Sequence, residues 1–116
     1  MASVSLGTVS FSNSRVATPA GTAWRVRITI EGGVTTPEAF AEAVRALALD
    51  QDEPGLGVIF DGAAPVWGYA MLCHKGHKFA WVGTWDPRLQ AAVVVQSHWP
   101  VVAEGDRLAV NGEQPR

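Results

Sequence analysis

Apolar and polar residues alternate in two stretches near the start of the chain, residues 4–12 and 23–31. In the second stretch valine and isoleucine share one face, and polar side chains occupy the positions between them. This period of two predicts two β-strands that each bury one face. The polar residues 12–22 between the two strands predict a hairpin loop.

Residues 32–50 predict an α-helix, because their apolar side chains recur at helical spacing. Thr36 is suited to cap the start of this helix, and Pro37 is suited to its first turn. The predicted apolar face consists of Phe40, Ala43, Val44 and Leu47.

A short apolar run at residues 56–60 predicts a strand that is buried on both faces and ends before Asp61. Residues 61–78 then predict a turn and a second helix, with Pro65 in its first turn and Gly76 at its end. The predicted apolar stripe of this helix consists of Val66, Tyr69, Ala70 and Cys73.

Residues 79–85 predict a further strand, and the strand, helix, strand order predicts a right-handed parallel crossover. Residues 86–90 predict a turn, after which residues 91–98 should return antiparallel. The tail, 99–110, is expected to add an edge strand. The chain is therefore predicted to be an α/β protein with a mixed, mostly five-stranded sheet and two helices.

The composition favours one domain that covers residues 1–116, because the chain has 116 residues of which 47% are hydrophobic and 17% charged. Residues 1–3 and 112–116 are expected to be disordered. No apolar run approaches the roughly 18 residues that a membrane span needs, so we expect no membrane partner.

The start of the chain lacks a basic region followed by an apolar stretch, so we expect a cytoplasmic protein without a secretory signal. The single cysteine, Cys73, excludes a disulfide within the chain and is expected to be a small buried side chain. A formal net charge of -2 argues against a basic surface for duplex DNA. It leaves room for a small anion in one focused pocket.

The predicted crossover sorts the polar side chains into two groups. Asp61 and Asp86 each follow a parallel strand, so they should share one edge of the sheet with Arg88. The histidines should gather at the opposite edge: His74, His77 and His98. The nine steps from His77 to Asp86 span up to roughly 30 Å, too far for cooperation within one subunit if the strand is straight.

Each group also has a purely structural explanation. Asp86 precedes a proline, which is ordinary turn chemistry, and Arg88 can simply neutralise its charge. The histidines can form a solvated rim instead of a metal or acid–base site. Most of the five tryptophans are expected in the core, although Trp67 or Trp99 could stack on a base.

Three sequence stretches, GVIFDGAAPVW, AWVGTWDPRL and AVVVQSH, together with the histidines that end the second helix, carry a family resemblance. They resemble a CRISPR-associated ring-nuclease family that accompanies type III systems, over roughly residues 24–110. The resemblance implies a distant relative of the CRISPR-associated, Rossmann-like sensor fold. It also implies a manganese-dependent enzyme that binds and linearises cyclic tetra-adenylate and so switches off antiviral signalling.

By position, His77 and Asp86 match the family's essential pair, and the resemblance implies that they help to hold the manganese ion. Arg88 and His98 match its supporting polar residues. The resemblance further implies homodimers that stack head to tail, into tetramers or filaments, around the cyclic ligand. The ligand-binding residues that it implies are Asp61, Gly62, Ala63, Ala64, Pro65 and Trp67.

The chain departs from the family pattern before the second helix, where a small polar residue and Gly-Arg-Gly-Pro are expected. Ala63 stands in place of the arginine, and a carboxylate at Asp61 would repel a phosphate unless it is turned away or holds a metal. Gln90 and Ala91 also lengthen the following turn by one residue. Three functions therefore remain open: cleavage of the cyclic nucleotide, its binding without cleavage, and self-assembly without any ligand.

Overall fold

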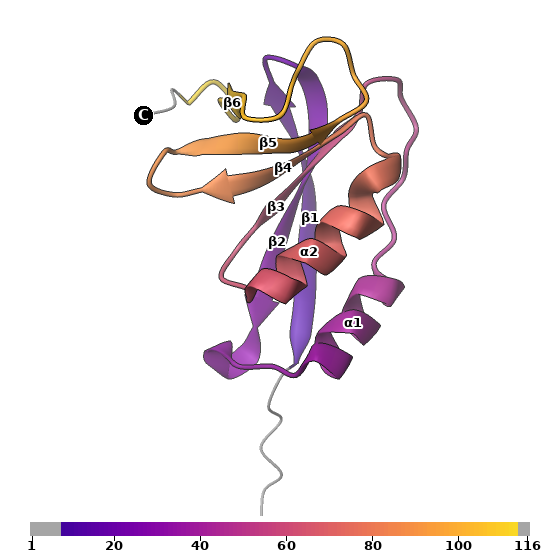
Figure 1. Cartoon of the computed structure of the whole chain (residues 1–116), viewed down its shortest axis with the longest axis vertical. Coiled ribbons are helices and arrows are strands. Elements are labelled where there is room, and N and C mark those ends of the chain that lie inside the picture. Colours follow the sequence, from indigo (N-terminus) through magenta and orange to yellow (C-terminus); the bar gives the residue numbers. More distant parts are fainter. Residues whose placement is uncertain (1–7, 114–116) are drawn as a thin grey trace, which may run out of the picture.

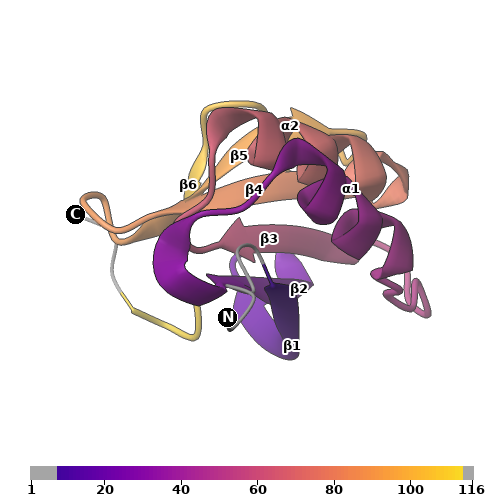
Figure 2. The same ribbon diagram turned by 90° about the horizontal axis from the view of Figure 1, so that it is seen from below.

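The computed structural model describes residues 8–113, and these form one six-stranded sheet with two α-helices against it (Figure 1). Seen from below, α1 and α2 lie together on one side of the sheet (Figure 2). In chain order the elements are β1 (Val9–Thr18), β2 (Gly21–Ile30), the 3-10 turn η1 (Glu31–Gly33), α1 (Pro37–Ala46), β3 (Gly57–Asp61), α2 (Val66–Lys75), η2 (Gly76–Lys78), β4 (Trp81–Asp86), β5 (Ala91–Ser97) and β6 (Arg107–Leu108).

The strands lie side by side in chain order, from β1 to β6. The three central strands, β2, β3 and β4, are parallel to one another, whereas β1, β5 and β6 each pair antiparallel with a neighbour. The predicted α/β class, the mixed sheet, the crossover and the edge strand in the tail are confirmed. The described residues contain no helix that is long and apolar enough to cross a membrane.

The predicted hairpin loop at residues 12–22 is wrong, because β1 and β2 pair without interruption from Val9↔Ile30 to Thr18↔Gly21. Only two residues connect the strands, and the turn is closed by a 2.7 Å hydrogen bond from the Thr18 hydroxyl to the Gly21 carbonyl oxygen. The serines that suggested a loop lie in β1, which is an edge strand and exposes much of its surface.

Parts of two predictions fall on residues that the structure does not describe. The first four positions of the predicted strand 4–12 and the predicted disorder of residues 1–3 and 114–116 lie outside residues 8–113. Gly112 and Glu113 are described, and they lie in a turn in which the Glu113 N–H donates to the Val110 carbonyl oxygen at 3.1 Å.

Helix α1 begins and packs as the sequence predicts. The Thr36 hydroxyl accepts a hydrogen bond from the Ala39 N–H at 3.2 Å, and Pro37 is the first helical residue. Phe40 and Val44 are buried against the sheet. The helix is shorter than predicted, since the backbone becomes extended at Leu47, whose side chain remains buried.

Helix α2 covers the predicted residues, and its predicted apolar stripe is correct at Tyr69 and Cys73, which pack against the core, but wrong at Val66 and Ala70. The buried positions are Gly68 and Leu72, whereas Val66 and Ala70 are exposed. Gly68 explains the rotation, because a Cβ atom there would lie 2.9 Å from Cζ of Phe40. The helices approach closely through this glycine, and Val66 is left facing outward beside β4 and β5.

Pro65 precedes α2 as its N-cap residue instead of lying in the first turn, and Gly76 ends the helix as predicted. Cys73 is only partly buried; burial nevertheless raises the pKa of its thiol, which favours the neutral form.

Two groups of buried side chains sandwich the sheet. One lies between the sheet and both helices and includes Phe40, Phe60 and Leu72. The other lies on the opposite face, under the C-terminal segment, and includes Trp81. Of the five tryptophans, Trp81 alone is fully buried, so the expectation that most lie in the core is only partly confirmed.

Gly57 leaves room for the fully buried indole of Trp81, because a Cβ atom at this glycine would overlap the ring. We expect Gly57→Ala to lower the free energy of unfolding by about 2 kcal/mol or more, since neither the strand nor the ring can move freely. Urea denaturation measures the change. When Gly57→Ala and Trp81→Leu are combined, the loss of unfolding free energy should be smaller than the sum of the two single losses. A Gly57→Ala protein as stable as the wild type contradicts this packing.

Candidate functional site

The polar side chains separate to two edges of the sheet, as predicted. Asp61 and Asp86 end the parallel strands β3 and β4, at one edge. His77 lies in the turn after α2, and His98 follows β5, at the other edge. The His98 N–H donates to the Ala80 carbonyl oxygen at 2.8 Å, which ties this residue to the start of β4.

The two carboxylates share an edge but face opposite sides of the sheet. Phe60 is paired with Thr84 in the register of β3 and β4, and both face α2. Because successive strand residues alternate, Asp61 faces away from the helices while Asp86 faces them. A single ligand on one face of this sheet therefore meets only one of the two carboxylates.

Asp61 forms an ion pair on the face of the sheet that is turned away from the helices. Its Oδ2 accepts hydrogen bonds from Nε and Nη2 of Arg25 at 3.0 and 2.8 Å, and both side chains are largely buried. The Arg25 guanidinium also lies 4.8 Å from the ring centroid of Trp85. The carboxylate is thus turned away from the helix start and neutralised, which removes the repulsion that the sequence predicts for a phosphate there.

The turn from β3 into α2 has a fixed backbone. Gly62 has φ +144°, and a Cβ atom there would press against the backbone of Ile28. The Tyr69 hydroxyl donates to the Gly62 carbonyl oxygen at 2.6 Å. Burial raises the pKa of Tyr69, and the negative charge of Asp61 adds to the rise, so the phenol remains a donor at neutral pH.

Ala63, Ala64, Pro65 and Trp67 line a shallow cavity of about 390 Å³ against the segment that follows β2. None of the residues that line it is charged. The Trp67 ring meets Phe40 edge-on, with 5.8 Å between the centroids, and is 36% exposed. This part of the predicted ligand site offers apolar contact and backbone groups, without the cation that the family pattern has at position 63.

Asp86 organises the turn between β4 and β5. Its Oδ1 accepts the N–H groups of Arg88 and Leu89 at 2.9 and 3.2 Å. Arg88 approaches the same oxygen with its Nε at 3.8 Å, but its side chain is 91% exposed. Gln90, which lengthens the turn, has φ +51°. The turn therefore holds Asp86 in place and leaves the Arg88 guanidinium available to an anion.

The three exposed histidines contact one another. The rings of His74 and His77 stack with 5.7 Å between centroids. Nδ1 of His77 lies 3.0 Å from the His74 carbonyl oxygen, and Nε2 of His98 lies 3.1 Å from the His77 carbonyl oxygen. Since a carbonyl oxygen only accepts, these two nitrogens carry the protons. In the neutral rings, Nε2 of His77 and Nδ1 of His98 are then the unprotonated nitrogens.

Two adjoining cavities lie between the two edges. One cavity, of about 660 Å³, reaches from Val66 and Tyr69 to His77 and Thr84. A second, of about 500 Å³, reaches from Tyr69 and Thr84 to Asp86 and Arg88. Because they share Tyr69 and Thr84, the two cavities adjoin, and together we call them the groove between α2 and the β4–β5 hairpin, with a histidine end and an aspartate end.

His77 and Asp86 do not form a metal site within one chain. They line different cavities, and no group of three or more His, Cys, Asp or Glu side chains suitable for a metal occurs within residues 8–113. The manganese ion that the resemblance implies therefore stays a prediction.

Comparison with known families matches residues 36–109 to the family described as CRISPR-associated protein (Cas_csx3). This match covers more than half of the chain. The chain belongs to the CRISPR-associated Cas_csx3 family. The matched region begins twelve residues after the start of the resemblance at residue 24 and contains the crossover, both ends of the groove and the turn of Asp86.

A relative in Aquifex aeolicus (strain VF5), described as an uncharacterized protein, is 40% identical to this Cas_csx3 family member over 55 residues. The match covers 47% of this chain and 50% of the relative, so the chain spans about half the length of that curated relative. The match supports kinship and assigns no activity.

The sequence did not single out Arg25 or Tyr69, although both hold the candidate site in place. Arg25 is 36 positions away from its partner Asp61, and only the parallel pairing of β2 with β3 brings them together. Tyr69 was placed in an apolar stripe, whereas its hydroxyl fixes the turn at Gly62. One signal could have indicated Arg25: it is a polar residue within a predicted strand, and such a residue can pair with a carboxylate that ends a neighbouring strand.

Arg25 offers a test of this arrangement. We expect Arg25→Met to lower the free energy of unfolding by about 2 kcal/mol, because it leaves the largely buried Asp61 carboxylate without its partner. Arg27→Met is the matched control, since Arg27 is 63% exposed and 3.9 Å from the same carboxylate; its effect should stay within about 0.5 kcal/mol. Chemical denaturation compares them, and equal losses contradict the special role of Arg25.

Proposed function

We propose that this Cas_csx3 family member acts in the cytoplasm, where it binds and cleaves cyclic tetra-adenylate and so ends type III CRISPR signalling. One observation carries the proposal: the groove has the imidazoles of His74 and His77 at one end, and the fixed Asp86 with the exposed Arg88 at the other. These groups suit general acid–base chemistry on a phosphodiester.

In the proposed reaction the ribose 2′-oxygen attacks the adjacent phosphorus, and the bond from phosphorus to the 5′-oxygen breaks. Nε2 of His77 accepts the proton of the 2′-hydroxyl. His98 in its protonated form donates a proton to the leaving 5′-oxygen, and Arg88 shares the charge on the phosphate. The products are a 2′,3′-cyclic phosphate and a 5′-hydroxyl, so that atoms and charge balance without water.

We propose that two molecules complete the site. Strand β4 rises about 17 Å over its five steps, so the histidine end and the aspartate end of one groove are too far apart to act on one phosphate. Dimers that stack head to tail would bring the histidine end of one molecule to the aspartate end of the next. No step is assigned to a metal, and the assay with cyclic tetra-adenylate is run with and without manganese.

A second candidate function is binding of the cyclic nucleotide without cleavage. It is favoured by Ala63 and by the uncharged cavity beside it, which lack the cation expected to grip a phosphate. Linear products accumulating during incubation with cyclic tetra-adenylate would exclude this candidate. Retention of the intact ring on the protein, without product, would favour it over cleavage.

The first functional prediction concerns the two ends of the groove. His77→Ala should lower the rate of cleavage at least about a hundredfold because it removes the acceptor of the 2′-hydroxyl proton, and Asp86→Asn should do the same because it removes the carboxylate charge that lies 3.8 Å from Nε of Arg88. Asparagine retains an oxygen that can accept the N–H groups of the turn, so the fold should persist. His74→Ala is the control, because it removes the imidazole that stacks on His77 but has no step in the proposed reaction, so its effect on the rate should be smaller. Unchanged rates for His77→Ala or Asp86→Asn contradict the assignment.

The second functional prediction concerns assembly. When the inactive His77→Ala and Asp86→Asn proteins are mixed in equal amounts, about a quarter of randomly stacked junctions should pair two intact ends. Cleavage should return toward that fraction of the wild-type rate and increase with protein concentration. A mixture that stays inactive while light scattering shows stacks on the ligand would place both residues in the site of one subunit.

A further inference from the structure

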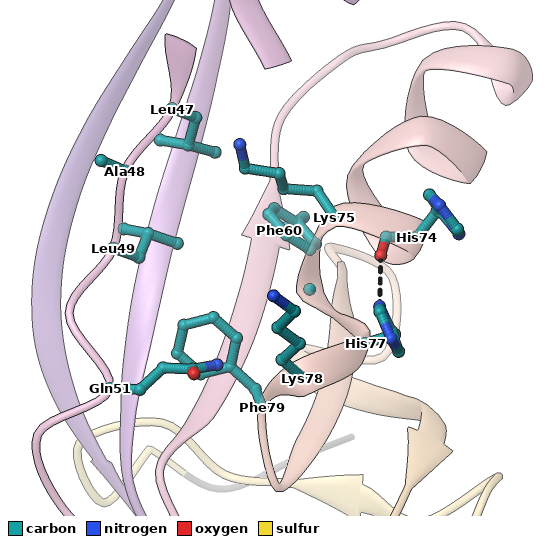
Figure 3. A pocket seen from close by; sticks show the side chains of 11 residues that line it. Leu47, Ala48, Leu49, Gln51, Phe60, His74, Lys75, His77, Lys78 and Phe79 are labelled. Carbon is teal, nitrogen blue, oxygen red and sulfur yellow. Dashed lines mark hydrogen bonds between the residues drawn. The ribbon is translucent and has the colours of Figure 1, made fainter. Parts of the chain in front are cut away.

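A separate cavity of about 540 Å³ opens on the other side of the α2 end, toward the segment that follows α1 (Figure 3). Its apolar wall includes Leu47, Phe60 and Phe79, which are buried, and Leu49. Figure 3 shows the Phe79 ring between this segment and η2. The volume lies within the range of pockets that hold small ligands, and the wall offers a surface on which a flat ring can pack.

The rim of this cavity is basic. Lys75, Lys78, His74 and His77 line it, and none of its lining residues is acidic. Figure 3 shows the ammonium ends of both lysines directed toward the segment of Leu47 and Leu49. Lys75 donates to the Arg45 carbonyl oxygen at 3.3 Å, and Lys78 has no hydrogen bond or ion pair within the described residues. Two positive charges without an acidic partner favour an anionic ligand.

Gln51 adds selectivity for a base. Its side-chain amide extends toward Phe79 across the cavity (Figure 3) and makes no hydrogen bond to the described part of the chain. A glutamine amide has a donor and an acceptor side by side, which match the N7 acceptor and the N6 donor of adenine. Guanine presents two acceptors at the corresponding edge and fits less well.

We propose that this cavity binds one adenylate unit, with its base against the apolar wall at Leu49 and its phosphate at Lys75 and Lys78. His77 lines both this cavity and the groove, so the unit lies next to the proposed reaction centre. The choice of an adenylate unit rests on the proposed function. The basic rim, the apolar wall and the amide of Gln51 are features of the structure that do not depend on the proposed function.

Adenosine 5′-monophosphate is the probe, titrated into the isotope-labelled chain of 116 residues and followed by NMR. The amide signals of Leu49 and Phe79 should shift, and Lys78→Gln should raise Kd roughly tenfold, the loss of one charge-assisted hydrogen bond. Arg27→Gln is the matched control: it removes the same charge from an exposed position on the opposite face of the sheet and should leave Kd unchanged. Gln51→Leu should abolish the difference in Kd between adenosine 5′-monophosphate and guanosine 5′-monophosphate.

Three results overturn the inference: no shifts at about 10 mM nucleotide, shifts confined to other regions, or equal effects of Lys78→Gln and Arg27→Gln. Inorganic phosphate that binds as tightly as the nucleotide also overturns it, because the base would then contribute nothing. Cleavage of cyclic tetra-adenylate is measured separately. Its absence contradicts the proposed function, whereas nucleotide binding alone decides the inference.

Discussion

The parallel pairing of β2, β3 and β4 is the constraint on which the arrangement of this molecule depends. Because the three strands run in the same direction, Asp61 and Asp86 lie at the same edge of the sheet. Helix α2 runs back to the opposite edge, where His77 lies. The antiparallel return of β5 then brings His98 beside His77. The separation of the two aspartates from the histidines is therefore a consequence of strand direction.

Two contacts fix this sheet in the form that the groove needs. On one face, Gly68 lets α2 approach Phe40, and this orientation places Tyr69 in the wall of the groove. On the other face, Arg25 joins Asp61 to Trp85, the residue before Asp86. The turn that presents Asp86 and Arg88 is thus supported from behind by an ion pair that takes no part in the proposed reaction.

His77 is the point where two surfaces meet. It lines the groove that leads to Asp86 and the basic cavity of Lys75 and Lys78. Its backbone carbonyl accepts from His98, and its own ring donates to His74, so that its position is fixed although it is exposed. A phosphodiester held at this imidazole would have one neighbouring unit within reach of each surface.

The sequence by itself determined the α/β class, the crossover, the capped start of α1, the edge at which each polar residue lies and the kinship with a CRISPR-associated family. The first four follow from periodicity, turn residues and strand direction, which are local or depend on chain order alone. The kinship follows from the resemblance of the stretches GVIFDGAAPVW, AWVGTWDPRL and AVVVQSH to the family. The sequence wrongly predicted a loop in place of much of the β1–β2 hairpin, because an exposed edge strand tolerates serines. It also wrongly placed Val66 and Ala70 in the apolar stripe of α2, where Gly68 decides which face packs. Only the tertiary structure decided that Asp61 is neutralised by Arg25, that Asp61 and Asp86 face opposite sides, and that Gln51 lies across a cavity from Lys78. Each of these depends on strand register or on packing between distant segments, which no short stretch of sequence specifies.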